Sequence, residues 1–371
     1  MKEKLVVKTP GKLMVAGEFA VLEKGYPLLV MAVDRYVHTV IEDARSYRFT
    51  SENFEMYNLT WHFDGERVIF DNYSPRLKFV TSALTTVLTY LQEKGVATTP
   101  FSLSVRSELD DEETGAKYGL GSSAAVVTSV VTAILEKFLQ YPPARSLIFK
   151  IAAIAHVRTQ GSGSGADIAA STYGGVIYYK SFQANWLLYE LRNSKEILPV
   201  IQKKWRHLQI KEFQFPKNAH LCIGWTGNPA STKSLVSEIS KLKKNNRAAY
   251  ETFLQNSRRA VNLIVQGINQ DDEAIFFKGI TNNRHTLAKL GAVSNVPIET
   301  EKLALLSELA EQLNGVGKLS GAGGGDCGIA FLQKEADRTR LYELWEENGI
   351  QPLALTVDKA GTIVTEGFSN E

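Results

Sequence analysis

One uncharged segment limits how this chain can fold more than any other feature. Residues 118–135 contain no charged side chain, and Lys117 and Glu136 bound the segment directly. Its length is near the lower limit for a membrane-spanning helix. However, Gly119, Gly121 and several Ser and Thr residues interrupt its apolar character. We therefore expect a buried helix of a soluble protein, entered through a glycine turn, and no membrane span.

The remaining composition is that of an ordinary globular protein with two domains. The chain has 371 residues, 44% of them hydrophobic and 22% charged, and single cores rarely grow beyond about 250–300 residues. Its net charge of +2 offers no broad basic field, so nucleic acid is not expected as a partner. Cys222 and Cys327 form no CxxC pair, which argues against a disulfide framework or a cysteine zinc site and favours a cytoplasmic location.

Hydrophobic periodicity predicts strands and helices without strict alternation, which favours an α+β fold. Ser74 and Pro75 are a helix-start signal for a helix that ends near Gly95. The pattern restarts near Trp205, so we place domains at 1–205 and 206–371. Strands are predicted at 6–7, 28–33, 36–41, 101–106, 176–179, 208–213, 220–224, 327–332, 353–357 and 362–365. Further helices are predicted after Gly121, around 148–155, and at 247–268, 299–313 and 335–347. The turn signals at 10–11 and 25–27 are read as breaks between strands.

Four glycine-rich segments carry the chemical signal. They cover residues 10–18, 119–124, 161–167 and 321–326. Glycine lets backbone N–H groups converge on an anion, since positive φ and close approach carry no side-chain penalty. The second segment directly precedes the uncharged helix, whose positive dipole end and unpaired N–H donors suit phosphate. A phosphate-binding site is the function that these segments indicate.

Other nucleotide-site patterns fit less well. Residues 119–124 and 161–166 both match G-x-G-x-x-A, but neither directly follows a strand as the dinucleotide fingerprint requires. Gly317-Lys318 is followed by Leu319, so a P-loop is absent, as are the protein-kinase motifs. The acidic run 108–113 is interpreted as a solvated loop and not as a metal site.

Taken together, three of the segments resemble the motifs of the GHMP kinase superfamily, which contains galactokinase, homoserine kinase, mevalonate kinase and phosphomevalonate kinase. The matching stretches are 10–18 (PGKLMVAGE), 119–125 (GLGSSAA) and 318–326 (KLSGAGGGD). The resemblance implies an N-terminal ribosomal-protein-S5-like domain that binds ATP and a C-terminal ferredoxin-like domain, with the active site in the cleft between them. It also implies ATP and Mg²⁺ as cofactors, a small-molecule substrate, and no protein partner.

Within this superfamily the chain is most similar to the phosphomevalonate kinases. Phe19 follows Glu18, where mevalonate kinases usually have His and galactokinases have a Glu-His-x-Asp-Tyr motif. Segments 117–123, 161–175 and 224–231 are also similar to phosphomevalonate kinase motifs. The implied reaction is transfer of the ATP γ-phosphoryl group to phosphomevalonate, giving diphosphomevalonate and ADP in isoprenoid biosynthesis. The alternatives are a mevalonate kinase and a non-catalytic binding member of the superfamily.

The resemblance also assigns candidate site residues. It implies that Lys12 and Asp167 are catalytic, and that Ser122 is the Mg²⁺ ligand. The implied ATP and phosphate contacts are Lys117, Gly119, Leu120, Gly121, Ser122, Ser123 and Ala124. The implied substrate contacts are Lys12, Ser231, Ser320, Gly321, Ala322, Gly323 and Gly324.

Each catalytic candidate also has an ordinary structural interpretation. Asp167 would be a general base for an alcohol acceptor, but a phosphate acceptor is already nucleophilic, which favours an orienting role. Without the resemblance Asp167 is a helix N-cap, Lys12 a solvated lysine, and Ser122 a helix cap. His156 is interpreted as ordinary helix packing and left out of the site.

Overall fold

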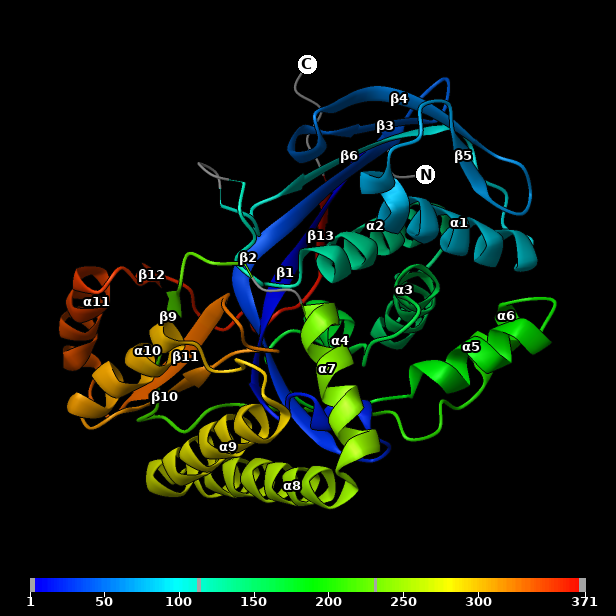
Figure 1. Ribbon diagram of the computed structural model, residues 1–371. Helices are drawn as coiled ribbons and strands as arrows, with labels where there is room; N and C mark the ends of the chain where they lie inside the picture. Colours follow the sequence, from blue (N-terminus) through cyan, green and yellow to red (C-terminus); the bar gives the residue numbers. More distant parts are fainter. Residues whose placement is uncertain (1–3, 112–114, 230–231, 367–371) are drawn as a thin grey trace.

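The structure is a computed structural model, and it describes residues 4–111, 115–229 and 232–366. Within these residues nine strands form one large sheet and four strands form a smaller one (Figure 1). Helices pack against both sheets, so the fold is α+β, as predicted.

The large sheet is built around β2 (Pro27–Asp43), which pairs antiparallel with β1 (Lys4–Ala16) along nearly all of its length. On its other side β2 has two partners: its start pairs with β7 and its end pairs with β6. The order is β13-β1-β2-β6-β3-β4-β5, with β8 paired to β7. The other strands of this sheet are β3 (Arg48–Ser51), β4 (Met56–Phe63), β5 (Val68–Phe70), β6 (Phe101–Ser107), β7 (Val176–Lys180), β8 (Gln209–Phe213) and β13 (Ile363–Glu366).

The expected break at Pro10-Gly11 is wrong. β1 continues through both residues, and the pairing register with β2 shifts between them. A bulge accommodates proline in a strand, because the ladder hydrogen bond that proline lacks is already interrupted there. The bulge changes the direction of the strand just before Lys12. The two strands predicted at 28–33 and 36–41 are likewise one continuous strand, β2.

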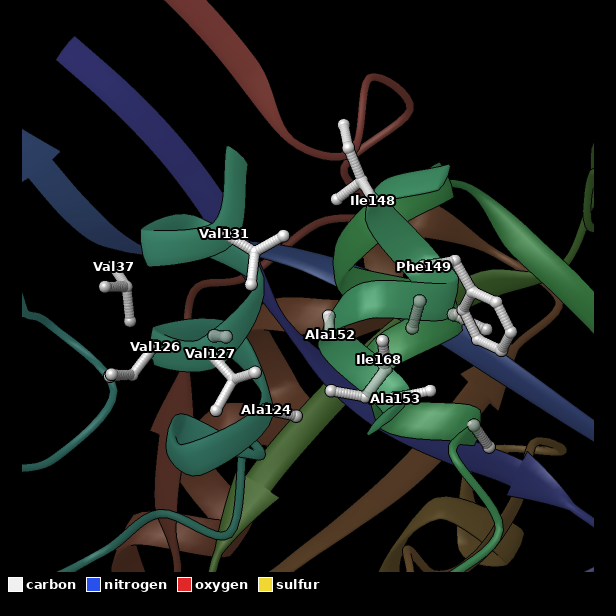
Figure 2. Packing of buried hydrophobic residues seen from close by; sticks show 14 of the residues in the cluster. Val37, Ala124, Val126, Val127, Val131, Ile148, Phe149, Ala152, Ala153 and Ile168 are labelled. Carbon is white, nitrogen blue, oxygen red and sulfur yellow. The ribbon is translucent and has the colours of Figure 1, made fainter. Parts of the chain in front are cut away.

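The uncharged segment forms α2 (Ser122–Phe138), which packs with α1 (Lys78–Glu93), α3 (Arg145–Gln160) and α4 (Ala166–Tyr173) against the large sheet. Figure 2 shows the apolar contact between α2 and α3, with Ile168 of α4 in the same buried cluster. Two hydroxyl groups of α2 are hydrogen bonded inside the protein: Ser129 Oγ donates to Thr39 Oγ1 at 2.7 Å, and Thr132 Oγ1 donates to Thr128 O at 2.8 Å. In the described part of the chain, no helix has the length and apolar character to cross a membrane. The start of α1 follows a short 3-10 turn that Ser74 caps and Pro75 begins, as predicted.

The smaller sheet has the antiparallel order β10-β11-β9-β12. Its strands are β9 (His220–Trp225), β10 (Val316–Leu319), β11 (Cys327–Leu332) and β12 (Gln351–Leu353). α10 (Glu301–Gln312) and α11 (Arg338–Glu347) pack beside it, and Trp345 Nε1 donates to Leu306 O at 3.1 Å. The buried cluster of Leu306, Leu341, Trp345 and Ile350 joins these helices to the sheet.

A helical hairpin of α8 (Arg247–Gln270) and α9 (Glu273–Ser294) covers the lower part of the molecule in Figure 1. The sequence did not predict α9, because glycines and polar residues interrupt its apolar pattern. The glycine at 279 has a packing reason, since a Cβ there would lie 2.5 Å from Ile264 Cγ1 and 2.8 Å from its backbone nitrogen. Gly279 therefore lets the two helices approach closely. Three shorter helices were also not predicted: α5 (Ala184–Asn193), α6 (Leu198–Gln202) and α7 (Thr232–Asn245).

The end of the chain returns to the large sheet. Asp34 accepts hydrogen bonds from the backbone N–H and the hydroxyl of Thr356, at 2.7 and 2.6 Å. Tyr36 OH donates to Asp358 Oδ2 at 2.8 Å, and β13 then pairs with the start of β1. Two strands beyond residue 205, β8 and β13, thus belong to the sheet that β1 begins. The division into 1–205 and 206–371 stays a prediction.

Candidate active site

The first and second glycine-rich segments meet at Lys12. Its backbone N–H donates to Leu120 O at 2.9 Å, and its Nζ donates to Gly119 O at the same distance. The aliphatic part of the side chain lies against Gly121, where a Cβ would be 3.0 Å from Lys12 Cγ. Lys12 is therefore a half-buried ammonium group on the phosphate-binding loop, and not a solvated surface lysine.

The second and third segments meet at Gly119. Its φ is +81°, and a Cβ at this position would lie 2.6 Å from the Asp326 carboxylate. Cys327 Sγ donates to Tyr118 O at 3.1 Å. Burial raises the pKa of the Cys327 thiol, and the negative charge of Asp326 raises it further, so the thiol stays neutral and serves packing.

The third segment is also joined to the first. Ser320 Oγ accepts from the backbone N–H of Met14 and donates to Met14 O, both at 2.9 Å. The hydroxyl of Ser320 is thus engaged in holding the third segment against β1. Gly323 and Gly324 contact a different neighbour: Gly324 N donates to Ile298 O at 2.8 Å, and a Cβ on Gly323 would lie 2.1 Å from the same oxygen.

The fourth segment places Asp167 beside β1. Gly165 is the N-cap of α4, so Asp167 lies in the first turn and is not the helix cap that its structural interpretation requires. One turn later Ser171 Oγ donates to Pro10 O at 2.9 Å. Residues four apart share one helix face, and Asp167 therefore lies on the face of α4 that meets β1. Burial, and next the negative charge of Asp167, raise the pKa of Tyr179, whose hydroxyl donates to Ser164 O.

The start of α2 is arranged for an anion. Gly121 is the N-cap, with φ 79° and no side chain that could cap the helix. Ala124 N and Ala125 N both donate to Gly121 O, so the N–H groups without an acceptor in the helix are those of Ser122 and Ser123. Ser122 and Ser123 are half-buried, and neither hydroxyl caps the helix. An anion at this end would meet unpaired N–H groups and the positive end of the helix dipole.

A cavity of about 520 Å³ opens beside the first, third and fourth segments. Asp167, Gly321 and Ala322 border it, together with Ser162–Ser164 of the fourth segment. Its other walls come from the first motif and from α7, including Phe19 and Ser237. Cavities that hold small molecules usually measure about 300–1,000 Å³. The cavity is thus large enough for one small molecule, and its described walls include no residue of the second segment.

Phe19 has an unusual backbone at the edge of this cavity. Its φ is 57°, a left-handed conformation that bulky side chains rarely adopt. The ring is buried in a cluster contributed mainly by α7, α8 and α9, which includes Ile239, Phe253 and Leu290. Phe19 therefore anchors the end of the first motif in the helical layer. Strain of this kind persists where the surrounding packing fixes it.

The predicted site residues divide into three groups. Lys12 contacts the second segment at Gly119, whereas Asp167, Gly321 and Ala322 border the cavity, so a single anion-binding cleft stays a prediction. Lys117 is exposed at the start of its loop, where it forms an isolated bridge with Asp110. Ser231 lies outside the described residues. The sequence interpretation missed His156, Gln183 and the α7 residues of the cavity wall, such as Ser240. For His156 a signal existed, because it lies in the helix that leads into the fourth segment.

Known proteins that are similar to this chain are GHMP kinases, and the similarity extends along nearly the whole chain. The family model described as GHMP kinases N terminal domain matches residues 79–175, and the one described as GHMP kinases C terminal matches residues 265–351. The chain is 35% identical to a phosphomevalonate kinase of a Streptomyces species, over 95% of this chain and 96% of the relative. It is 25% identical to a mevalonate kinase of Pyrococcus abyssi, over 99% of each chain.

Solved structures agree with this result. A crystal structure of a Listeria innocua protein superposes with a TM-score of 0.92 at 37% identity, covering 98% of this chain and all of the other. The Streptococcus pneumoniae phosphomevalonate kinase in complex with phosphomevalonate and AMPPNP superposes with a TM-score of 0.82 at 27% identity, covering 95% and 99%.

Proposed function

Because this chain belongs to the GHMP kinase family, we propose that it is a phosphomevalonate kinase, which transfers the γ-phosphoryl group of ATP to phosphomevalonate. The products are diphosphomevalonate and ADP. The observation that carries the proposal is the contact of Lys12 with the loop that leads into α2, together with a cavity that Asp167 and the third segment border. The likeness to relatives that are named phosphomevalonate kinases supports this choice of acceptor.

Electrostatic repulsion is the main obstacle to this reaction. The acceptor phosphate has a second pKa near ~6, so it is dianionic and nucleophilic at neutral pH without a base. At an effective dielectric constant of 20, each pair of unit charges ~4 Å apart repels by ~4 kcal/mol. Positive groups that are fixed in advance must offset this repulsion as charge spreads over the transferred oxygens.

Lys12 and the start of α2 supply these groups. In the structure the Lys12 ammonium group is held by Gly119 O, within the loop that would hold the ATP phosphates. The N–H groups at the start of α2, around Gly121, Ser122 and Ser123, would hold the β- and γ-phosphates. Leu120 and Ala124 set the backbone of this loop, and Lys117 would add charge at its exposed rim.

Magnesium fits this arrangement only as a partner of the nucleotide. In the described residues no group of three His, Cys, Asp or Glu side chains is placed to hold a metal ion. Mg²⁺ is commonly held by one or two protein oxygens together with substrate phosphates. The Ser122 hydroxyl is the protein oxygen that would hold it, and the ion would neutralise phosphate charge.

The acceptor would occupy the cavity beside Asp167. Gly321 and Ala322 border this cavity, so their backbone is close enough to contact the acceptor. Ser320 would act by holding the third segment on β1, and Gly323 and Gly324 by shaping the turn near Ile298. With a phosphate acceptor, Asp167 would orient Lys12 or the metal-bound nucleotide and would not remove a proton.

The wider assignments stay proposals as well. We place the ATP-binding domain at 1–205 and the ferredoxin-like domain at 206–371, with Ser231 as a further acceptor contact. A cytoplasmic location suits an enzyme that uses ATP, and the two free, buried cysteines fit a reducing compartment.

An acceptor profile tests the function directly. ADP release by the purified protein is measured with mevalonate, phosphomevalonate, galactose and homoserine as acceptors. We expect turnover with phosphomevalonate and little with the other three. Turnover with mevalonate alone would make the protein a mevalonate kinase, and nucleotide binding without turnover would make it a non-catalytic member of the family.

A further inference from the structure

His156 connects the phosphate-binding loop to the acceptor cavity. It lies in α3, its side chain is 4% exposed, and it borders the cavity. Ser123, in the first turn of α2, has its Oγ 3.2 Å from His156 Nε2. The imidazole also stacks on Phe79, with ring centroids 5.1 Å apart and an interplanar angle of 20°. The ring is therefore held between two fixed neighbours.

The charge of the cavity wall gives His156 particular importance. Among the described residues that border the cavity there is no lysine and no arginine. The acidic groups there are Asp167 and Glu18, and the other polar side chains are hydroxyls and amides. His156 is the only one of these described side chains that can carry a positive charge or donate from an imidazole. A phosphorylated carboxylic acid, the proposed acceptor, needs such a donor.

The two ring nitrogens have different surroundings. Nε2 contacts Ser123, whereas Nδ1 makes no hydrogen bond to the described part of the chain. Nδ1 is not one of the fully enclosed unpaired side-chain atoms of the described residues, so water or a ligand can reach it. A hydrogen bond from Nδ1–H to an acceptor oxygen would satisfy it, and Nε2 would then accept from the Ser123 hydroxyl.

We propose that His156 is a specificity-determining residue that contacts the anionic acceptor through Nδ1 and positions Ser123 through Nε2. This inference rests on the proposed function. Acceptor binding favours the tautomer with the proton on Nδ1, which makes Nε2 an acceptor and fixes the Ser123 hydroxyl at the start of α2. The acceptor cavity and the phosphate-binding loop are thereby linked by two consecutive hydrogen bonds.

Two isosteric substitutions separate the roles of the two nitrogens. In His156→Asn the amide nitrogen can occupy the place of Nδ1, and in His156→Gln it can occupy the place of Nε2. We expect His156→Gln to raise KM for phosphomevalonate about tenfold or more, because one hydrogen bond to a charged group is lost. The affinity for AMPPNP should change less than about twofold. His156→Asn should recover part of the acceptor KM. Ile154→Val, a small change in the same buried helix, is the matched control and should leave both values unchanged.

Imidazole NMR of the wild-type protein provides a readout that does not need turnover. The His156 resonance is assigned by its absence in the two variants, and phosphomevalonate alone is added. We expect a shift of the His156 ring nitrogens. An unmoved resonance, or equal changes in acceptor KM and AMPPNP affinity, would overturn the role of His156. Absence of wild-type turnover with phosphomevalonate would instead overturn the proposed function.

Discussion

Lys318 Nζ lies 2.5 Å from Glu18 Oε1, and both side chains are almost completely buried, at 0% and 1% exposed. The pair joins the first motif to the third glycine-rich segment, 300 residues further along the chain. Asn283 of α9 completes the network, since its Nδ2 donates to Glu18 Oε2 at 3.0 Å and its Oδ1 accepts from Gly17 N. Three separate parts of the chain thus share one buried ion pair at the edge of the acceptor cavity.

Removal of one partner should destabilise the protein strongly. Lys318→Met leaves the Glu18 carboxylate buried without its cation, and the expected loss is about 3–5 kcal/mol in the free energy of unfolding. Urea unfolding at pH 7 measures it. The double variant Glu18→Gln with Lys318→Met removes both charges and should regain part of the loss. Equal stability of the single variant and the wild type would contradict this view of the pair.

Replacement of Lys12 should lower turnover without unfolding the protein. Lys12→Ala removes the ammonium group that we propose to act on the transferred phosphoryl group, and we expect kcat to fall about 10²-fold or more. Steady-state ADP release measures kcat, and the thermal midpoint checks the fold. Lys24→Ala, at an exposed lysine near the same motif, is the control. An unchanged kcat in the Lys12 variant would remove Lys12 from the mechanism.

Asp167→Asn distinguishes an orienting carboxylate from a general base. With a phosphate acceptor, the acid limb of the kcat/KM profile follows the second pKa of the acceptor, near ~6. The variant should therefore have a lower kcat/KM with its acid limb at the same pH. Loss or displacement of that limb would instead identify Asp167 as a proton acceptor.

Gly119→Ala should disrupt the junction of the second and third segments. The positive φ is strained for alanine, and the new Cβ would lie 2.6 Å from Asp326 Cγ. We expect lower stability and a weaker affinity for AMPPNP. Gly115→Ala is a matched control, because its φ of +66° is similar but its Cβ position has no neighbour within 4 Å. Calorimetric binding and thermal unfolding of both variants measure the difference.

Asp110 should make the protein less stable as the pH rises. Burial raises the pKa of this carboxyl above its usual 3.8, although the positive charge of Lys117 lowers it in part. The folded state therefore holds the proton more tightly than the unfolded chain. Stability that is present below pH 3.8 is lost as the pH rises through the folded-state pKa. Asp110→Asn should raise the free energy of unfolding at pH 7 and leave it unchanged at low pH. A lower stability of the variant at pH 7 would contradict this.

Sequence signals within a few residues predicted helices and strands well where one local property decides the structure. Ser74 and Pro75 start a helical segment as expected, and β11 has the predicted bounds, because capping and a short buried apolar run are local properties. α9 was missed because its glycines serve contact with α8, which is a tertiary reason. The continuation of β1 through Pro10 likewise depends on pairing with β2.

The candidate site was predictable as a set of motifs but not as a geometry. The glycine-rich segments indicated phosphate, and the structure places them together. No local pattern connects Ser123 with His156, since only the packing of α3 against α2 brings them together. It also could not show that the Ser320 hydroxyl is engaged by Met14. Contacts between residues far apart in the chain have no local signature.

The late return of the chain to its first sheet has a consequence for biosynthesis. β13 covers the outer edge of β1, and residues 356–358 are held by Asp34 and Tyr36, so a ribosome must make almost the whole protein before that edge is paired. Until then β1 presents unpaired backbone groups to other nascent chains. Truncation before residue 354 should therefore favour aggregation in the cell, although the described residues of the catalytic cavity would all be present.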